Sequence, residues 1–140
     1  MSDLFNATEL ALFILRVGTG VIFIPHGYPK MTGGGGDEKG GRAHLTQSLA
    51  QIGLPFPYAF AVLVGAIEFF GGLLLILGLQ TQWASLALAF VMLVATGRVL
   101  VQRGFVSNAD FPFSLLVATL ALALLGGGTI SVEQIFLAVK

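Results

Sequence analysis

Four long apolar runs constrain this chain more than any other feature of its sequence. They cover about residues 8–26, 59–79, 83–101 and 111–126. A helix needs roughly 20 apolar residues to cross a bilayer. Backbone groups in lipid must be paired within their own segment, and the runs lack the period-two alternation of barrel strands. The sequence therefore predicts an all-α fold, a four-transmembrane-helix bundle formed by one domain over residues 1–140.

The amino-acid composition also indicates a membrane environment. Hydrophobic residues make up 56% of the 140 positions and charged residues 10%, against roughly 25% charged in a soluble domain. Seven basic and seven acidic side chains cancel, so no basic face for nucleic acid is expected. The partner implied directly is the lipid bilayer.

Glycine and proline mark the ends of the apolar runs. We expect the first helix to stop near Pro25, with Thr8 as an acceptable N-cap, and a long Gly-rich loop to join the first two helices. The glycines at 33–36 lack the Gly-Lys-Ser/Thr of a phosphate loop. Short interfacial helices are predicted over about 43–52 and 131–139, the second opened by a capping box at Ser131.

Four crossings place both termini on one side of the membrane and both longer loops on the other. Lys30, Lys39, Arg42 and Arg103 lie on the loop side. By the positive-inside rule we expect the loops in the cytoplasm and the termini outside.

Arg16, Glu68 and Arg98 lie within the predicted spans, where an ionised side chain needs a partner. Counted from the loop side, Arg16 lies about 15 Å deep and Glu68 about 14 Å. Because the first two helices are antiparallel neighbours, we expect Arg16 and Glu68 to form an ion pair near mid-bilayer. Gly65 and Gly72 share the Glu68 face and would allow close approach. The alternative is a purely structural pair that fixes helix register.

Further polar residues cluster on the loop side. Arg98 could extend to the headgroups or pair with Asp110, and His26 could be simply interfacial. Together His26, Glu68, Arg98 and Asp110 are expected to face one cavity that suits an amphipathic ring such as a quinone. His26 and Glu68 would handle protons, and Arg98 would stabilise charge on a reduced oxygen. The chain has no cysteine and no second histidine at i+4 from His26, so we expect no metal, haem or iron–sulfur cluster.

Two motifs resemble the DoxX family of small four-helix membrane proteins: His26-Gly-x-x-Lys30, and Gly65-x-x-Glu68-x-x-Gly-Gly72. Arg16 and the Trp83–Ala95 helix also fit the arrangement of the family, whereas the glycines at 33–36 do not. The resemblance implies a multi-pass protein of the bacterial plasma (inner) membrane, with Arg16, His26, Lys30 and Glu68 as its motif residues. Some relatives are small subunits of a thiosulfate:quinone oxidoreductase, and others associate with thiol-redox complexes.

Two functions follow as hypotheses. The first is a membrane subunit or quinone-interacting component of an oxidoreductase system, enzymatic only together with a redox partner. His26 and Glu68 would be its proton-handling groups, and Arg16, Lys30, Arg98 and Asp110 its cofactor-binding groups. The second is a non-catalytic membrane scaffold or assembly factor, acting with partner proteins or as a homo-oligomer. A small-solute transporter is a third reading, for which the bundle offers little room.

Overall fold

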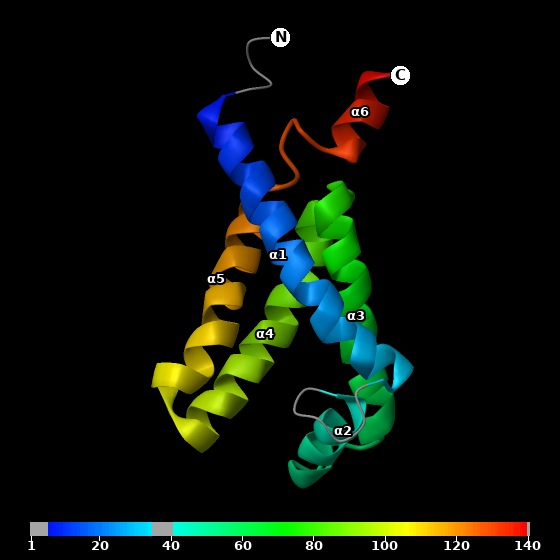
Figure 1. Ribbon diagram of the computed structural model, residues 1–140, viewed down its shortest axis with the longest axis vertical. Helices are drawn as coiled ribbons and strands as arrows, with labels where there is room; N and C mark the ends of the chain where they lie inside the picture. The colour runs from blue at the N-terminus through cyan, green and yellow to red at the C-terminus, as the bar shows by residue number, and fades with distance from the viewer. Residues whose placement is uncertain (1–5, 35–40, 140) are drawn as a thin grey trace.

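The computed structural model describes residues 6–34 and 41–139, and within them it is built of helices. The order along the chain is α1 (Ala7–Thr32), α2 (Arg42–Gln51), α3 (Pro57–Leu77), α4 (Thr81–Arg103), a short irregular turn η1 (Phe105–Ala109), α5 (Asp110–Leu125) and α6 (Val132–Ala138). Four segments of this described part are long and apolar enough to cross a membrane, which confirms the predicted all-α class. The start of α1 and helix α6 lie at one end of the molecule, and α2 lies at the other (Figure 1).

Helix α1 is longer at both ends than the sequence predicted. Its N-cap is Asn6, whose side chain accepts a hydrogen bond from the Thr8 backbone N–H at 3.0 Å, so the expected N-cap at Thr8 is wrong. The expected stop near Pro25 is also wrong, because Pro25 and Pro29 both lie inside α1. Helices in a membrane tolerate proline, because neighbouring helices and local adjustments satisfy the freed backbone groups.

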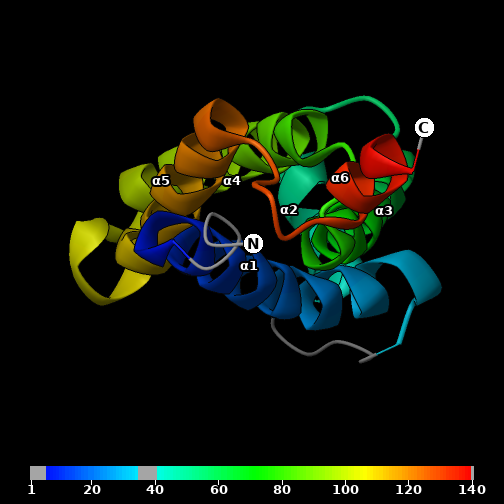
Figure 2. The same cartoon turned by 90° about the horizontal axis from the view of Figure 1, so that it is seen from above.

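The helices associate as two pairs. α1 packs most extensively against α3, and α4 packs most extensively against α5. Figures 1 and 2 show the pairs from the side and from above, with α4 and α5 beside each other and α1 lying against α3. Contacts between α3 and α4 and between α1 and α5 join the pairs into one bundle.

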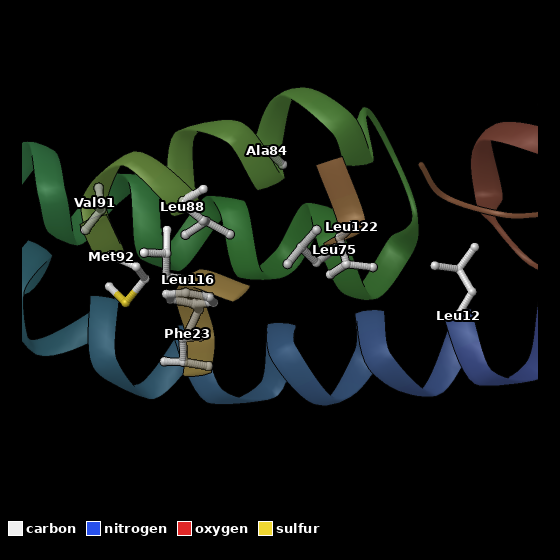
Figure 3. Packing of buried hydrophobic residues seen from close by; sticks show 11 residues of the cluster. Leu12, Phe23, Leu75, Ala84, Leu88, Val91, Met92, Leu116 and Leu122 are labelled. Atoms are coloured by element: carbon white, nitrogen blue, oxygen red, sulfur yellow. The ribbon is translucent and has the colours of Figure 1, made fainter. Parts of the chain in front are cut away.

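The core lies between the pairs and consists mainly of leucine, together with alanine, valine, methionine and phenylalanine (Figure 3). Phe23 of α1, Leu75 of α3, Leu88 of α4 and Leu122 of α5 are each almost completely buried. Many large apolar side chains instead point outward, including Phe90 and Leu124. An outer surface of this kind is stable against acyl chains and would be unfavourable in water.

Short elements close the two ends of the bundle. At the loop end α2 packs on the start of α3, and Arg42 lies over the Tyr58 ring with 4.9 Å between the guanidinium carbon and the ring centre. The glycines and charges of residues 35–40 lie outside the described residues. At the opposite end the segment 126–131 leads into α6. Ser131 is its N-cap and accepts the Gln134 backbone N–H at 3.3 Å, which is one of the two hydrogen bonds of the predicted capping box.

Candidate functional site

Glycines set the register between α1 and α3. Gly20 lies against Gly72, and Gly27 lies against Gly65, so that the two seven-residue spacings match across the antiparallel pair. A Cβ at Gly20 would come within 2.6 Å of the Gly72 carbonyl oxygen, and a Cβ at Gly27 within 2.6 Å of the Gly65 carbonyl oxygen. The two backbones are therefore as close as small residues permit.

Glu68 lies on this glycine face of α3, between its two glycines. A Cβ at Gly27 would come within 2.9 Å of the Glu68 Cβ, which places the carboxylate opposite the last third of α1. Lys30 is one turn further along α1, and its Cβ faces Gly65. This register brings Lys30 and Glu68 within reach of each other.

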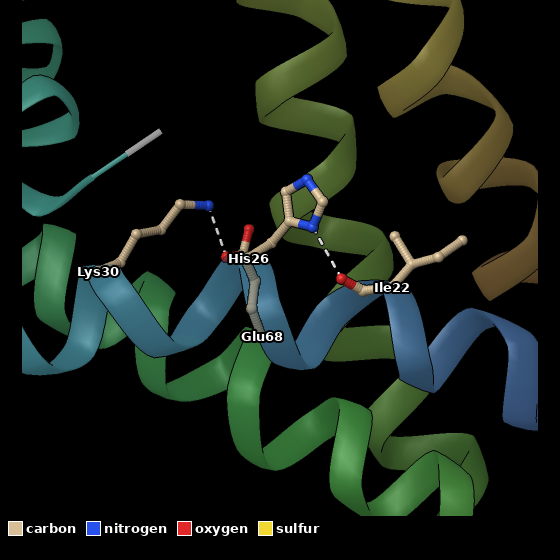
Figure 4. Close-up of polar contacts among 4 residues, drawn as sticks. All are labelled: Ile22, His26, Lys30 and Glu68. Carbon is tan, nitrogen blue, oxygen red and sulfur yellow. Dashed lines mark hydrogen bonds and ion pairs between the residues drawn. The ribbon is translucent and has the colours of Figure 1, made fainter. Parts of the chain in front are cut away.

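Lys30 and Glu68 form a buried ion pair. The Lys30 Nζ and the Glu68 Oε2 are 2.5 Å apart, with the Glu68 side chain 2% exposed and the Lys30 side chain 14% exposed (Figure 4). An ammonium in direct contact compensates the carboxylate charge where water is scarce. This contact reduces the free-energy cost of placing an ionised carboxylate within the membrane.

The predicted Arg16–Glu68 ion pair is wrong. The prediction assumed that the loop ends of the first two long helices stand at equal height. Instead α1 continues to Thr32, and the glycine register places Gly27 opposite Glu68. Arg16 is 11 residues from Gly27, which corresponds to about 16 Å along the helix. The charges of Arg16 and Glu68 therefore belong to opposite halves of the bundle.

Arg16 holds the segment that follows α5. Its Nη2 donates to the Ile130 carbonyl oxygen at 2.7 Å, and its Nη1 donates to the Gly127 carbonyl oxygen. The side chain is 1% exposed, and its guanidinium also lies near the Phe13 ring. Backbone carbonyls thus provide the partners that the sequence analysis assigned to a carboxylate. Glu9 holds the same segment from outside, since its Oε2 accepts the Thr129 backbone N–H at 2.6 Å and the Thr129 hydroxyl at 2.9 Å.

His26 shares a face of α1 with Lys30, one turn away. Its Nδ1 lies 2.8 Å from the Ile22 carbonyl oxygen (Figure 4), and a carbonyl can only accept, so Nδ1 carries a proton. The other ring nitrogen, Nε2, belongs to an exposed side chain. The imidazole also lies 5.8 Å from the Phe111 ring at the start of α5, measured between ring centres. His26 therefore connects the two helix pairs near the ion pair.

Arg98 and Asp110 are not joined to each other. Asp110 accepts the backbone N–H of Ser107 at 3.1 Å and that of Phe111 at 2.9 Å, so it organises the turn before α5. Among the residues with described positions, Arg98 makes no ion pair with Asp110, and the Arg98 Nε is buried without a hydrogen-bond partner. Of the predicted site residues, the structure brings Lys30 and Glu68 into contact, with His26 beside them.

Two cavities lie at the terminal end of the bundle, and neither is lined by His26, Glu68, Arg98 or Asp110. One has a volume of about 510 Å³ and is lined partly by Glu9 and Glu133. The other has about 500 Å³, and Arg16 is in its wall.

Lys30 is not the partner predicted for Glu68 from the sequence, although it belongs to the His26–Lys30 motif. The paired glycine spacings were the available signal. Aligning Gly20 with Gly72 and Gly27 with Gly65 gives the register directly, whereas counting from the apparent helix ends does not.

Comparisons with known proteins agree with this architecture. The model of the DoxX family matches residues 11–103. A protein of Bacillus subtilis (strain 168) named "Putative oxidoreductase CatD" is 33% identical over 125 residues, which cover 89% of this chain and 86% of that protein. No solved structure matches the chain. The resemblance carried by the His26–Lys30 and Gly65–Gly72 motifs is therefore confirmed, and the chain belongs to the DoxX family.

Proposed function

We propose that this chain is a quinone-interacting membrane component of an oxidoreductase system. The observation that carries the proposal is the Lys30–Glu68 ion pair next to His26, in the loop half of the bundle. A carboxylate and an imidazole in one place form a short route for protons. The name of the Bacillus relative is consistent with redox work.

The roles follow from the chemistry of quinone reduction, which takes up two electrons and two protons. Glu68 exchanges a proton while Lys30 compensates its charge, and His26 accepts or donates a proton at Nε2. Arg98 has a buried, unpartnered Nε on the loop half of α4 and would stabilise a reduced quinone oxygen. The electrons come from a partner that carries a redox cofactor, because ordinary side chains do not supply them.

Quinone binding to the purified protein in lipid nanodiscs tests this proposal. Short-chain ubiquinone and menaquinone analogues serve as probes, and binding is measured by equilibrium dialysis. We expect Glu68→Gln and His26→Ala to weaken binding. Glu133→Gln and His44→Ala are matched controls at sites away from the ion pair, and they should leave binding unchanged. Equal behaviour of all four variants and the parent would overturn the roles of His26 and Glu68.

The close glycine packing of α1 on α3 favours a second function, a non-catalytic scaffold or assembly factor in which the ion pair fixes helix register. In that case Glu68→Gln lowers thermal stability or yield, and quinone binding is absent from the parent protein as well. Pull-down of partner proteins from native membranes with parent and Glu68→Gln protein then measures assembly directly.

A further inference from the structure

The terminal end of the bundle contains a cavity of about 500 Å³ between α1, α3 and α6. Its walls are mainly apolar, and its polar atoms come from Arg16, Thr129 and Ser131. The apolar lining side chains are Phe13, Ile76, Leu77, Ile130, Val132 and Ile135. Ile135 is 63% exposed and Leu77 is 39% exposed, so the cavity is open to the surroundings of the bundle on this side. Figure 1 shows α6 above the end of α3 at this position.

Arg16 is a cation in this wall without a matching anion. Its Nη atoms donate to the carbonyl oxygens of Gly127 and Ile130, and its Nε is buried and unpartnered. Within residues 6–34 and 41–139, no carboxylate pairs with it. Carbonyl dipoles satisfy part of a guanidinium but do not cancel its charge, and a guanidinium has five N–H donors. The site therefore favours an anionic acceptor.

We propose that this cavity binds one anionic phospholipid from the leaflet on the side of the termini. The phosphate would complete the charge balance of Arg16, for which a guanidinium is well suited. An acyl chain would lie along Phe13, Leu77 and Ile135. The adjacent cavity is unsuitable for the same lipid, because Glu9 and Glu133 in its wall repel a phosphate. This inference goes beyond the proposed function and is independent of the loop-side residues His26 and Glu68.

Native mass spectrometry from nanodiscs provides the test. The protein is reconstituted with equal amounts of phosphatidylglycerol and phosphatidylcholine, and the lipid that stays bound is counted. Both lipids carry a phosphate, but the choline ammonium neutralises the phosphate of phosphatidylcholine, whereas phosphatidylglycerol keeps a net negative charge. We therefore expect phosphatidylglycerol to be retained about tenfold more than phosphatidylcholine. Equal retention of the two lipids would overturn the proposal.

Two variants and one competitor locate the site. Ile135→Trp fills the cavity without changing the contacts of Arg16 and should abolish the preference, even if Arg16→Gln proves too unstable to purify. Arg103→Gln removes an exposed arginine at the opposite end and should keep the preference. A preference that survives Ile135→Trp, or that disappears in Arg103→Gln, contradicts this location. Inorganic phosphate at millimolar concentration should not displace the lipid, and efficient displacement would indicate a free-anion site instead.

Discussion

Replacing Lys30 by Met removes the cation that compensates the buried Glu68 carboxylate. Glu68 is 2% exposed and Lys30 is 14% exposed, so solvent screens the pair only weakly. Breaking a buried ion pair by removing one partner costs about 3–5 kcal/mol, because it leaves an uncompensated charge. Lys30 keeps some exposure, and therefore we expect the lower end, a loss of about 3 kcal/mol in the free energy of unfolding.

Changing both partners should behave differently. In Lys30→Met/Glu68→Leu two apolar side chains of similar size replace the pair, and such replacements are often neutral or stabilising. We expect the double variant to lie within about 1 kcal/mol of the parent, because no buried charge remains. The coupling energy between positions 30 and 68 should then be about 2 kcal/mol or more.

The free energies can be measured by reversible unfolding in mixed micelles with increasing dodecyl sulfate, followed by circular dichroism. A second cycle with Arg16→Met and Glu68→Leu is the control, and it should be additive within about 0.5 kcal/mol because these side chains do not share a partner. Coupling to Arg16 and none to Lys30 would refute the register of α1 on α3.

Three further predictions concern close packing and the segment 126–131. Gly27→Ala should destabilise the protein by about 1–3 kcal/mol, because its Cβ would overlap the α3 backbone. In the same unfolding assay Gly18→Ala should be neutral or stabilising, because its Cβ would meet no neighbouring helix within 4 Å. Gly78→Ala should lower the free energy of unfolding by at least about 1 kcal/mol, because φ at this position is +69°. The loss should be larger still, because the new Cβ would meet the buried Arg16 guanidinium, and an unchanged melting temperature would contradict this. Glu9→Gln should speed amide hydrogen exchange at Thr129 without altering exchange in the core of α3, since it weakens the bonds to that backbone N–H; equal rates in parent and variant would argue against this contact.

Much of the fold follows from the sequence because hydrophobic length is a local property. A run of about 20 apolar residues has few structural options in lipid. The same holds for the N-cap at Ser131, which depends on neighbours within one turn. The proline-based end of α1 was predicted wrongly because Pro25 and Pro29 can stay inside a helix when neighbouring helices satisfy the backbone.

The sequence by itself determined that charges at positions 16, 30, 68 and 98 lie in or beside apolar spans, and that these charges require partners. Only the tertiary structure decided which partners they have. Helix register depends on where two backbones approach most closely, and here the glycines of α1 and α3 set that approach. The register therefore makes Lys30 the ion-pair partner of Glu68. The fold of the segment 126–131 places backbone carbonyls where they accept hydrogen bonds from Arg16. Ion pairing acts over a few ångströms, whereas position along a helix advances by about 1.5 Å per residue, so an uncertainty of two turns is enough to change every partner.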